Sequence, residues 1–149
     1  MTGVSIADES GSTCDLQALA DLSAHLIRSL RLHPDCELCI TLVDETRMSE
    51  LHEDWMQEPG PTDVLSFPMD ELRSADPGAD PVPGMLGDIV LCPAFAARQA
   101  AEKGRDLDSE LQFLVTHGML HLIGYDHATE QEYDAMFALQ DELLAGWVR

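Results

Sequence analysis

Residues 116–127 have the sequence THGMLHLIGYDH, and this stretch decides how the second half of the chain folds. His117 and His121 are four residues apart, so on a helix their imidazoles leave the same face one turn apart. Gly124 can adopt a positive φ and end that helix. The reversed chain can then carry His127 back towards the first two histidines. The stretch therefore predicts a helix end and a following turn that gather three imidazoles.

Three neutral imidazoles are well suited to zinc, and three protein ligands leave a fourth position for water or substrate. That arrangement is typical of a catalytic zinc site, whereas structural sites are closed by four protein ligands. Two histidines at this spacing arise by chance fairly often. Three of the six histidines within eleven residues, around a helix-ending glycine, favour a metal site. We therefore predict one Zn²⁺ per chain, bound by His117, His121 and His127.

The same spacing, H-x-x-x-H-x-x-G-x-x-H, occurs in the metzincin proteases. In those enzymes a glutamate directly after the first histidine acts as general base on the zinc-bound water. Gly118 occupies that position here, so a peptidase would lack its usual base. The motif thus argues against a protease, and a zinc hydrolase acting on a peptide or small ester stays open as an alternative.

The first half of the chain predicts strands separated by helices. Apolar residues at helical spacing predict a helix over residues 14–32. A second helix through Met48, Leu51 and Trp55 must end at the Pro-Gly-Pro of residues 59–61. Strands are expected at residues 4–7, 36–44, 63–67 and 88–91, and a long surface loop at 70–84.

Three further helices are expected after the last strand. One runs through Phe95 and ends near Gly104. The next begins with Asp108 as its N-cap and runs into the histidines. The last begins at Thr129, where Thr-x-x-Glu forms a capping box. With no internal repeat or linker, the pattern predicts one α/β or α+β domain over residues 1–149, with a sheet of about four strands.

The composition is ordinary for a soluble globular protein except in its charge. Asp and Glu total 28 against 8 Lys and Arg, which gives a net charge of −20. Such a charge repels nucleic acid, because phosphate binding draws its affinity from Lys and Arg. We interpret most of it as a solvated acidic surface. No stretch approaches the ~20 apolar residues of a membrane span, and no secretory signal is apparent, so we expect a cytoplasmic protein without a membrane partner.

The cysteines do not indicate a second metal site. Cys36 and Cys39 form a CxxC, but it lies in a β-branched apolar run, where residues three apart point to opposite faces. No second CxxC completes a four-cysteine site. We interpret these two, with Cys14 and Cys92, as ordinary buried or half-buried thiols, consistent with a reducing compartment.

The string HGMLHLIGYDH, at residues 117–127, resembles the YbeY family, which are metal-dependent endoribonucleases implicated in ribosomal RNA maturation. Three further segments are similar to that family and occur in the same order and spacing. They are LVDET at residues 42–46, PTDVLSFP at 61–68 and LGDIVLCP at 86–93. The resemblance covers roughly residues 36–144, and a combination of four motifs is highly specific.

The resemblance implies an α+β fold, a small mixed sheet with about five helices packed around it, and a zincin-like metal site in which the three histidines bind zinc. The implied activity is cleavage of single-stranded RNA. Its implied roles are processing of the 3′ end of 16S rRNA and ribosome quality control. The implied partners are rRNA and the small ribosomal subunit or its proteins. Thr62, Asp63 and Ser66, at a strand end near the site, are candidates for positioning substrate, and N-capping or strand-pairing roles stay equally open. Asp126 is a candidate to hydrogen-bond a ligand histidine or, less favoured, to accept a proton.

The chain departs from the family at one position. Many members carry a basic stretch, Tyr-Arg-Gly-Lys-Asp-Lys, just before Pro-Thr-Asp, and its arginine is thought to assist catalysis. Met56 stands there instead, and methionine cannot pair with a phosphate or stabilise developing charge. Arg47, Arg73 and Arg98 are candidate replacements. This departure and the acidic composition keep a third function class open, a ribosome-assembly factor whose zinc site is mainly structural and whose acidic surface docks basic ribosomal proteins.

Overall fold

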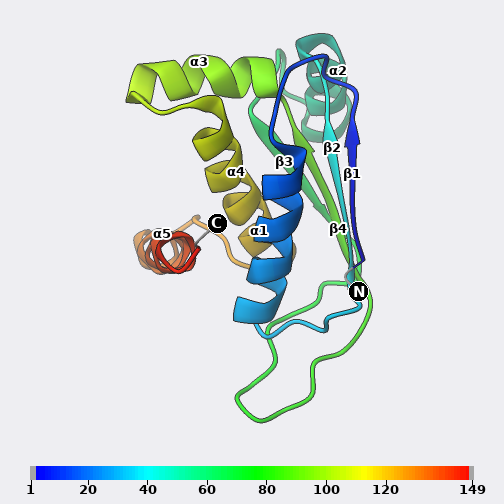
Figure 1. The fold of residues 1–149 in the computed structure, drawn as a ribbon, viewed down its shortest axis with the longest axis vertical. Helices are drawn as coiled ribbons and strands as arrows, with labels where there is room; N and C mark the ends of the chain where they lie inside the picture. Colours follow the sequence, from blue (N-terminus) through cyan, green and yellow to red (C-terminus); the bar gives the residue numbers. More distant parts are fainter. Residues whose placement is uncertain (1–2, 148–149) are drawn as a thin grey trace.

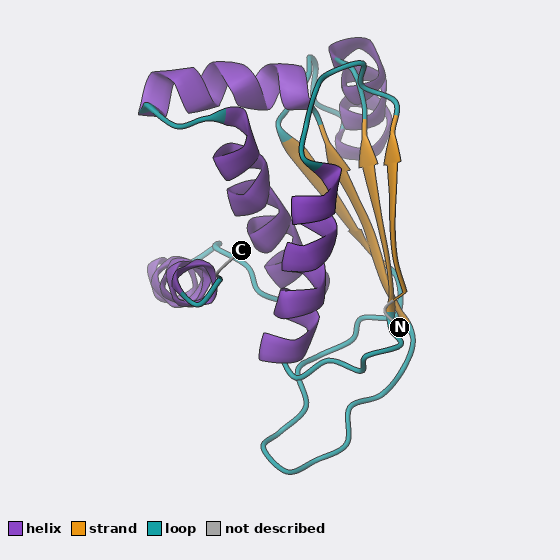
Figure 2. Ribbon diagram, viewed as in Figure 1, coloured by secondary structure: helices purple, strands orange, loops and turns teal. Residues whose placement is uncertain are grey.

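The computed structural model describes residues 3–147, which form four strands and five helices (Figures 1 and 2). They are β1 (Gly3–Asp8), α1 (Leu16–Ser29), β2 (Glu37–Leu42), α2 (Glu45–Met56), β3 (Val64–Pro68), β4 (Met85–Leu91), α3 (Pro93–Lys103), α4 (Leu107–Leu122) and α5 (Glu130–Ala145). The strands form one sheet in the order β1-β2-β4-β3. Its first three strands are parallel, and β3 runs antiparallel to β4. The expected α+β fold with a mixed four-stranded sheet and five helices is confirmed within the described residues.

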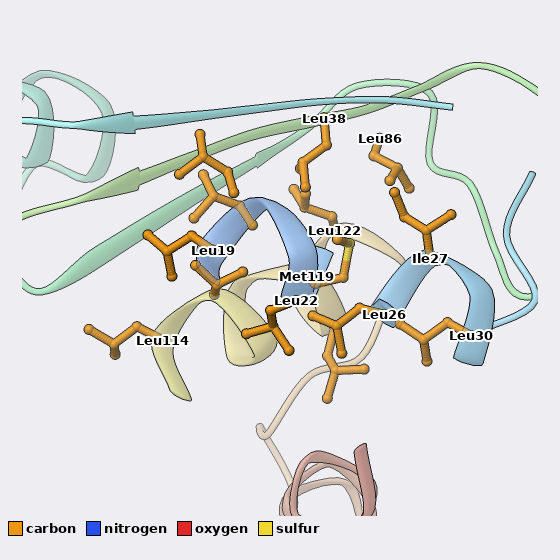
Figure 3. Close-up of a cluster of buried hydrophobic side chains, with 14 of the residues drawn as sticks. Leu19, Leu22, Leu26, Ile27, Leu30, Leu38, Leu86, Leu114, Met119 and Leu122 are labelled. Atoms are coloured by element: carbon orange, nitrogen blue, oxygen red, sulfur yellow. The ribbon is translucent and has the colours of Figure 1, made fainter. Parts of the chain in front are cut away.

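The main core lies between one face of the sheet and the helices α1 and α4 (Figure 2). Alternation along β2 points Leu38, Ile40 and Leu42 to this side, and all three are buried. Figure 3 shows the leucines of α1 meeting Met119 and Leu122 of α4 in the same cluster. Because α4 is packed against the sheet, α1 and α5, the helix that carries the histidines is held rigidly.

The opposite face of the sheet carries a smaller cluster under α2. Val43, Met48, Leu65, Val90 and Cys92 are buried there. This packing places the end of α2 and the start of β3 on the same side of the molecule as the turn after α4, because all three line one cavity.

Two helices begin at residues other than the expected ones. The N-cap of α4 is Asp106, whose carboxylate accepts a hydrogen bond from the Ser109 N–H. The expected cap, Asp108, lies in the first turn and accepts instead from the Asp15 N–H. Asp15 itself caps α1, so that helix covers Leu16–Ser29 rather than residues 14–32. The expected capping box of α5 is confirmed, because the Thr129 hydroxyl accepts from the Glu132 N–H.

Strand β4 begins at Met85, three residues before the predicted start. Gly87 extends the strand, because it pairs with Leu38 of β2 and Pro68 of β3. Its φ is +136°, and a Cβ there would lie 2.1 Å from the Phe67 carbonyl oxygen. The close approach of β3 and β4 therefore requires glycine at this position.

The predicted surface loop is confirmed, since residues 69–84 contain neither helix nor strand. In Figure 1 the loop extends beyond the sheet at the end where the chain begins. Hydrogen bonds between Arg31 and Ala75 tie it to the end of α1. Cys36 and Cys92 are buried and Cys14 and Cys39 are half-buried, all as free thiols, as expected. Within residues 3–147, no helix combines the length and the apolar character needed to cross a membrane.

Candidate metal centre

His117 and His121 lie on the last turns of α4, and His127 lies on the turn that follows. The helix ends at Leu122, and Gly124 reverses the chain with a φ of +99°. One ring nitrogen from each histidine lies within 4.8 Å of the other two, so the three could hold a metal ion. The clustering that the spacing predicts is confirmed.

Hydrogen bonds determine which ring nitrogens face the centre. His117 Nδ1 lies 3.2 Å from Gln140 Oε1, and His121 Nδ1 lies 3.0 Å from the Tyr125 carbonyl oxygen. The Gln140 amide nitrogen donates to the Phe113 carbonyl, so its oxygen is the atom that faces His117. Both Nδ1 atoms therefore carry their proton, and both Nε2 atoms keep a lone pair.

The arrangement of these lone pairs fits a metal ion. The Nε2 atoms of His117 and His121 are 3.0 Å apart. Two lone pairs at that distance repel each other unless a cation lies between them. Tetrahedral zinc, with Zn–N bonds of ~2.0–2.1 Å, requires ligand nitrogens about 3.3 Å apart, which is close to the observed spacing.

Burial also favours the neutral, metal-binding form of the rings. It lowers the pKa of His117 and of His121 below the usual histidine value, and the neighbouring histidines act in the same direction. The hydrogen bonds to Gln140 and to the Tyr125 carbonyl act in the opposite direction, as do Asp63 near His117 and Asp126 near His121, but burial outweighs them. Because metals bind unprotonated imidazole, both rings are ready to bind at neutral pH.

The three histidines line an open cavity of about 570 Å³. Strand β3 contributes one wall, and Met56 at the end of α2 contributes another. Asp63 and Ser66 are among the lining residues. Thr62 supports Asp63, because its hydroxyl donates to the Asp63 carboxylate. Two of the three candidates for positioning substrate thus face the cavity directly.

Asp126 also lines this cavity and is exposed. Its carboxylate accepts from the His127 backbone N–H at 2.7 Å. The ring N–H groups of His117 and His121 go instead to Gln140 and Tyr125. The orientation of these two rings therefore rests on Gln140 and Tyr125.

Gly118 shows why the metzincin glutamate has no place in this fold. A Cβ at residue 118 would lie 3.0 Å from Ser66 Oγ and 3.3 Å from two side-chain carbons of Ile89. The helix is packed against β3 and β4 at this point, and a longer side chain would have to displace the side chains of Ser66 and Ile89. The structure thus supports the argument against a peptidase.

Among the three candidate arginines, Arg73 lies next to the site. Arg47 and Arg98 pair with glutamates of α2. The Arg73 guanidinium packs on Gly124, where a Cβ would lie 2.6 Å from its Cζ and 2.7 Å from its Nε. Gly124 lines both the metal cavity and a shallow cavity that Arg73 shares. The long loop therefore brings a cation to the rim of the site.

Gln140 is the site residue that the sequence analysis missed. It is fully buried on α5, between the buried Met136 and Leu143 of the same helical face. A polar residue at a core position is unusual unless it has a buried partner. That single polar position in an apolar stripe was the available signal.

Known proteins resemble this chain over nearly its whole length. The model of the family described as "Endoribonuclease YbeY" matches residues 5–148. A protein of that name from Thermobifida fusca is 55% identical over 146 residues, covering 98% of this chain and 94% of the relative. The corresponding protein of a Nocardioides species is 51% identical over 144 residues, covering 97% of both chains. A solution structure of a Thermotoga maritima protein superposes with a TM-score of 0.60 and 26% identity, covering 96% of this chain and 91% of that one.

Proposed function

The chain belongs to the YbeY endoribonuclease family, and from this premise we propose that it is a zinc-dependent enzyme that cuts single-stranded RNA. Its proposed role is rRNA maturation, at the 3′ end of 16S rRNA, and ribosome quality control. We place it in the cytoplasm, with rRNA and the small ribosomal subunit as its partners. The three-imidazole centre on an open cavity is the observation that carries the proposal.

In this proposal His117, His121 and His127 bind one zinc ion. Zinc bound there would lower the pKa of a coordinated water towards ~7 and polarise a phosphoryl oxygen. Gln140 and the Tyr125 carbonyl keep the first two rings oriented through their Nδ1–H groups. These hydrogen bonds hold the ring nitrogens in place without contacting the substrate.

The acidic and polar groups of the cavity have separate proposed roles. Asp63, which directly precedes β3 and is held by the Thr62 hydroxyl, and Ser66 of β3 position the RNA. Asp126 is exposed on the same cavity and accepts a proton from a water there. Its hydrogen bond to the His127 backbone fixes the carboxylate beside the third ligand.

Arg73 is the proposed contact for the phosphate. Its Nη1 donates to the carbonyls of Glu71 and Leu72, which fixes the guanidinium at the loop. The face of the guanidinium lies against Gly124 at the cavity rim, because a Cβ there would be nearest to Cζ and then to Nε. A guanidinium can bind a phosphate with two parallel hydrogen bonds. Arg73 thus supplies the charge that Met56 cannot supply from α2.

The test is cleavage of purified single-stranded RNA by the zinc-loaded protein, with zinc content measured on every variant. We expect the wild type to cut and a folded His121→Ala variant neither to hold zinc nor to cut. His33→Ala, a histidine distant from the centre, is the matched control and should behave as wild type. Arg73→Met should cut about 100-fold more slowly with unchanged zinc content, since it loses one charged contact to the transition state.

No cutting by a fully zinc-loaded wild type would contradict the proposal. That result would favour the ribosome-assembly factor, which the net charge of −20 suits because such a surface attracts basic ribosomal proteins. Cleavage of peptides without cleavage of RNA would favour the hydrolase alternative instead.

A further inference from the structure

A second, smaller cavity of about 270 Å³ lies between α4 and α5 beside the metal centre. Phe113 of α4 and Tyr133 and Phe137 of α5 give it aromatic walls. It shares His117 and His127 with the larger cavity, so the two adjoin at the histidine cluster. A molecule bound at the metal centre can therefore extend into this second cavity.

The aromatic rings form a row that leads outward from the metal centre. Tyr133 and Phe137 are one turn apart on α5, and their rings are stacked at 4.4 Å with 30° between the planes. The Phe137 ring lies 5.6 Å from the ring of His117, which in turn lies 5.7 Å from that of His127. Tyr133 is 50% exposed, so this row is accessible from solvent at its outer end. Packing of α5 on the core does not account for an aromatic ring at that position.

The charges around the cavity suit a nucleotide whose backbone runs along α4. Lys103 and Arg105 lie over the ring of Phe113, at 5.5 and 4.8 Å from its centroid. They share one carboxylate, that of Glu110, and Asp63 adds a second carboxylate to the lining of the cavity. The first turn of α5 is acidic and disfavours a phosphate close to Tyr133. Near Tyr133 the cavity therefore offers ring faces to a base, whereas the cations lie at Phe113.

We propose that this cavity is a stacking subsite for one unpaired nucleobase of the RNA substrate, belonging to a nucleotide next to the bond that is cut. Tyr133 and Phe137 supply the stacking surface. Aromatic rings stack on every base, so the subsite would be tolerant of sequence. A base paired in a duplex cannot enter it, so the subsite would select single strands. The inference rests on the function proposed above and names how that site would recognise its substrate.

Paired substitutions test the stacking directly. Tyr133→Leu and Phe137→Leu keep an apolar side chain and remove the ring, whereas Tyr133→Phe and Phe137→Tyr keep a ring. Binding is followed by the fluorescence quenching of a single 2-aminopurine in a phosphorothioate-linked RNA, and KM and kcat are measured on unmodified RNA. We expect each leucine variant to bind RNA about tenfold or more weakly, mainly through KM, and each ring-keeping variant to match the wild type. Trp55→Leu, which removes a more exposed aromatic ring on α2, should have no effect.

An abasic nucleotide placed in turn at each position of the RNA locates the subsite. One position should weaken binding to the wild type as much as Tyr133→Leu does, and should add nothing further in the Tyr133→Leu protein. Equal effects of Tyr133→Leu and Tyr133→Phe, or additive losses at every abasic position, would overturn the subsite while RNA cleavage by the wild type stands. A wild type that neither binds nor cuts RNA would overturn the proposed function and the subsite together.

Discussion

Glu110 carries a fully buried carboxylate on α4, the helix of the metal ligands. Its Oε2 accepts from Lys103 Nζ and its Oε1 from Arg105 Nη1, each at 3.2 Å. The Glu110 side chain is 0% exposed, whereas those of Lys103 and Arg105 are 46% and 38% exposed. The anion has lost its water and the cations have kept much of theirs, so the two sides of the pair contribute unequally to stability.

We predict that removing the two cations destabilises the protein more than removing the anion. The double substitution Lys103→Met and Arg105→Met leaves the buried Glu110 carboxylate without its cationic partners, which costs about 3–5 kcal/mol in the free energy of unfolding. Glu110→Gln removes the buried charge and keeps its volume, while the freed cations return to water. That variant should lose only about 1–2 kcal/mol. A domain of this size has a total of about 5–15 kcal/mol, so the difference is measurable.

Urea denaturation followed by far-UV circular dichroism measures both free energies, with chelator present in all samples so that metal binding does not contribute. The methionine substitutions keep apolar contact with Phe113, which limits losses from packing alone. A cost of Glu110→Gln equal to or above that of the double variant would refute the reasoning. The carboxylate would then be stabilising beyond its desolvation cost.

Three further predictions follow from single positions. Gly87→Ala should lower the free energy of unfolding in urea by about 3 kcal/mol or more, because its Cβ would meet the Phe67 carbonyl oxygen at 2.1 Å. Gly60→Ala is also at positive φ but has no atom within 4 Å, so it should cost only about 1–2 kcal/mol. Equal costs would contradict the steric argument. Gln140→Leu should weaken zinc binding about 10- to 100-fold in chelator competition, and Gln140→Glu should not, since only leucine leaves the ring N–H without an acceptor. Burial raises the pKa of Cys14 to about 11, so in the native protein its alkylation should be slow at pH 8 and accelerate as the pH approaches 11; rapid labelling at pH 8 would contradict this.

Most of the helices and strands could be predicted from local periodicity and local motifs in the sequence. Five helices and four strands follow from apolar spacing and from Pro and Gly at their ends. The start of β4 could not be predicted, because the strand passes through Gly87 in a backbone conformation that only its neighbours in space require. The predicted N-cap of α4, Asp108, was wrong for a different reason. Asp106 and Asp108 are both good N-caps, and packing of Asp108 on the α1 N-terminus decides between them.

The same distinction separates the predicted from the unpredicted parts of the site. The three histidines lie within one helix end and one turn, so their spacing alone brings them together. Gln140 reaches His117 from 23 residues away, and only the packing of α5 on α4 makes that contact. Arg73 comes from a loop without periodicity, and its place on Gly124 depends on the path of that loop. Contacts between distant segments cannot be predicted from the periodicity of a single sequence.

An acidic protein could bind RNA if most of its binding energy came from contacts other than those to phosphates. Most RNA-binding proteins draw it from many phosphate contacts, which a chain with 8 Lys and Arg against 28 Asp and Glu cannot supply. Among residues 3–147, the cations near the centre are Arg73 at the rim and the Lys103–Arg105 pair at Phe113. The proposed metal and stacking rings do not need a basic surface, because the metal would bind the reacting phosphate and the rings would bind bases. The acidic remainder of the surface would then disfavour RNA that cannot place an unpaired base beside the histidines, so the unfavourable charge would increase selectivity for single strands.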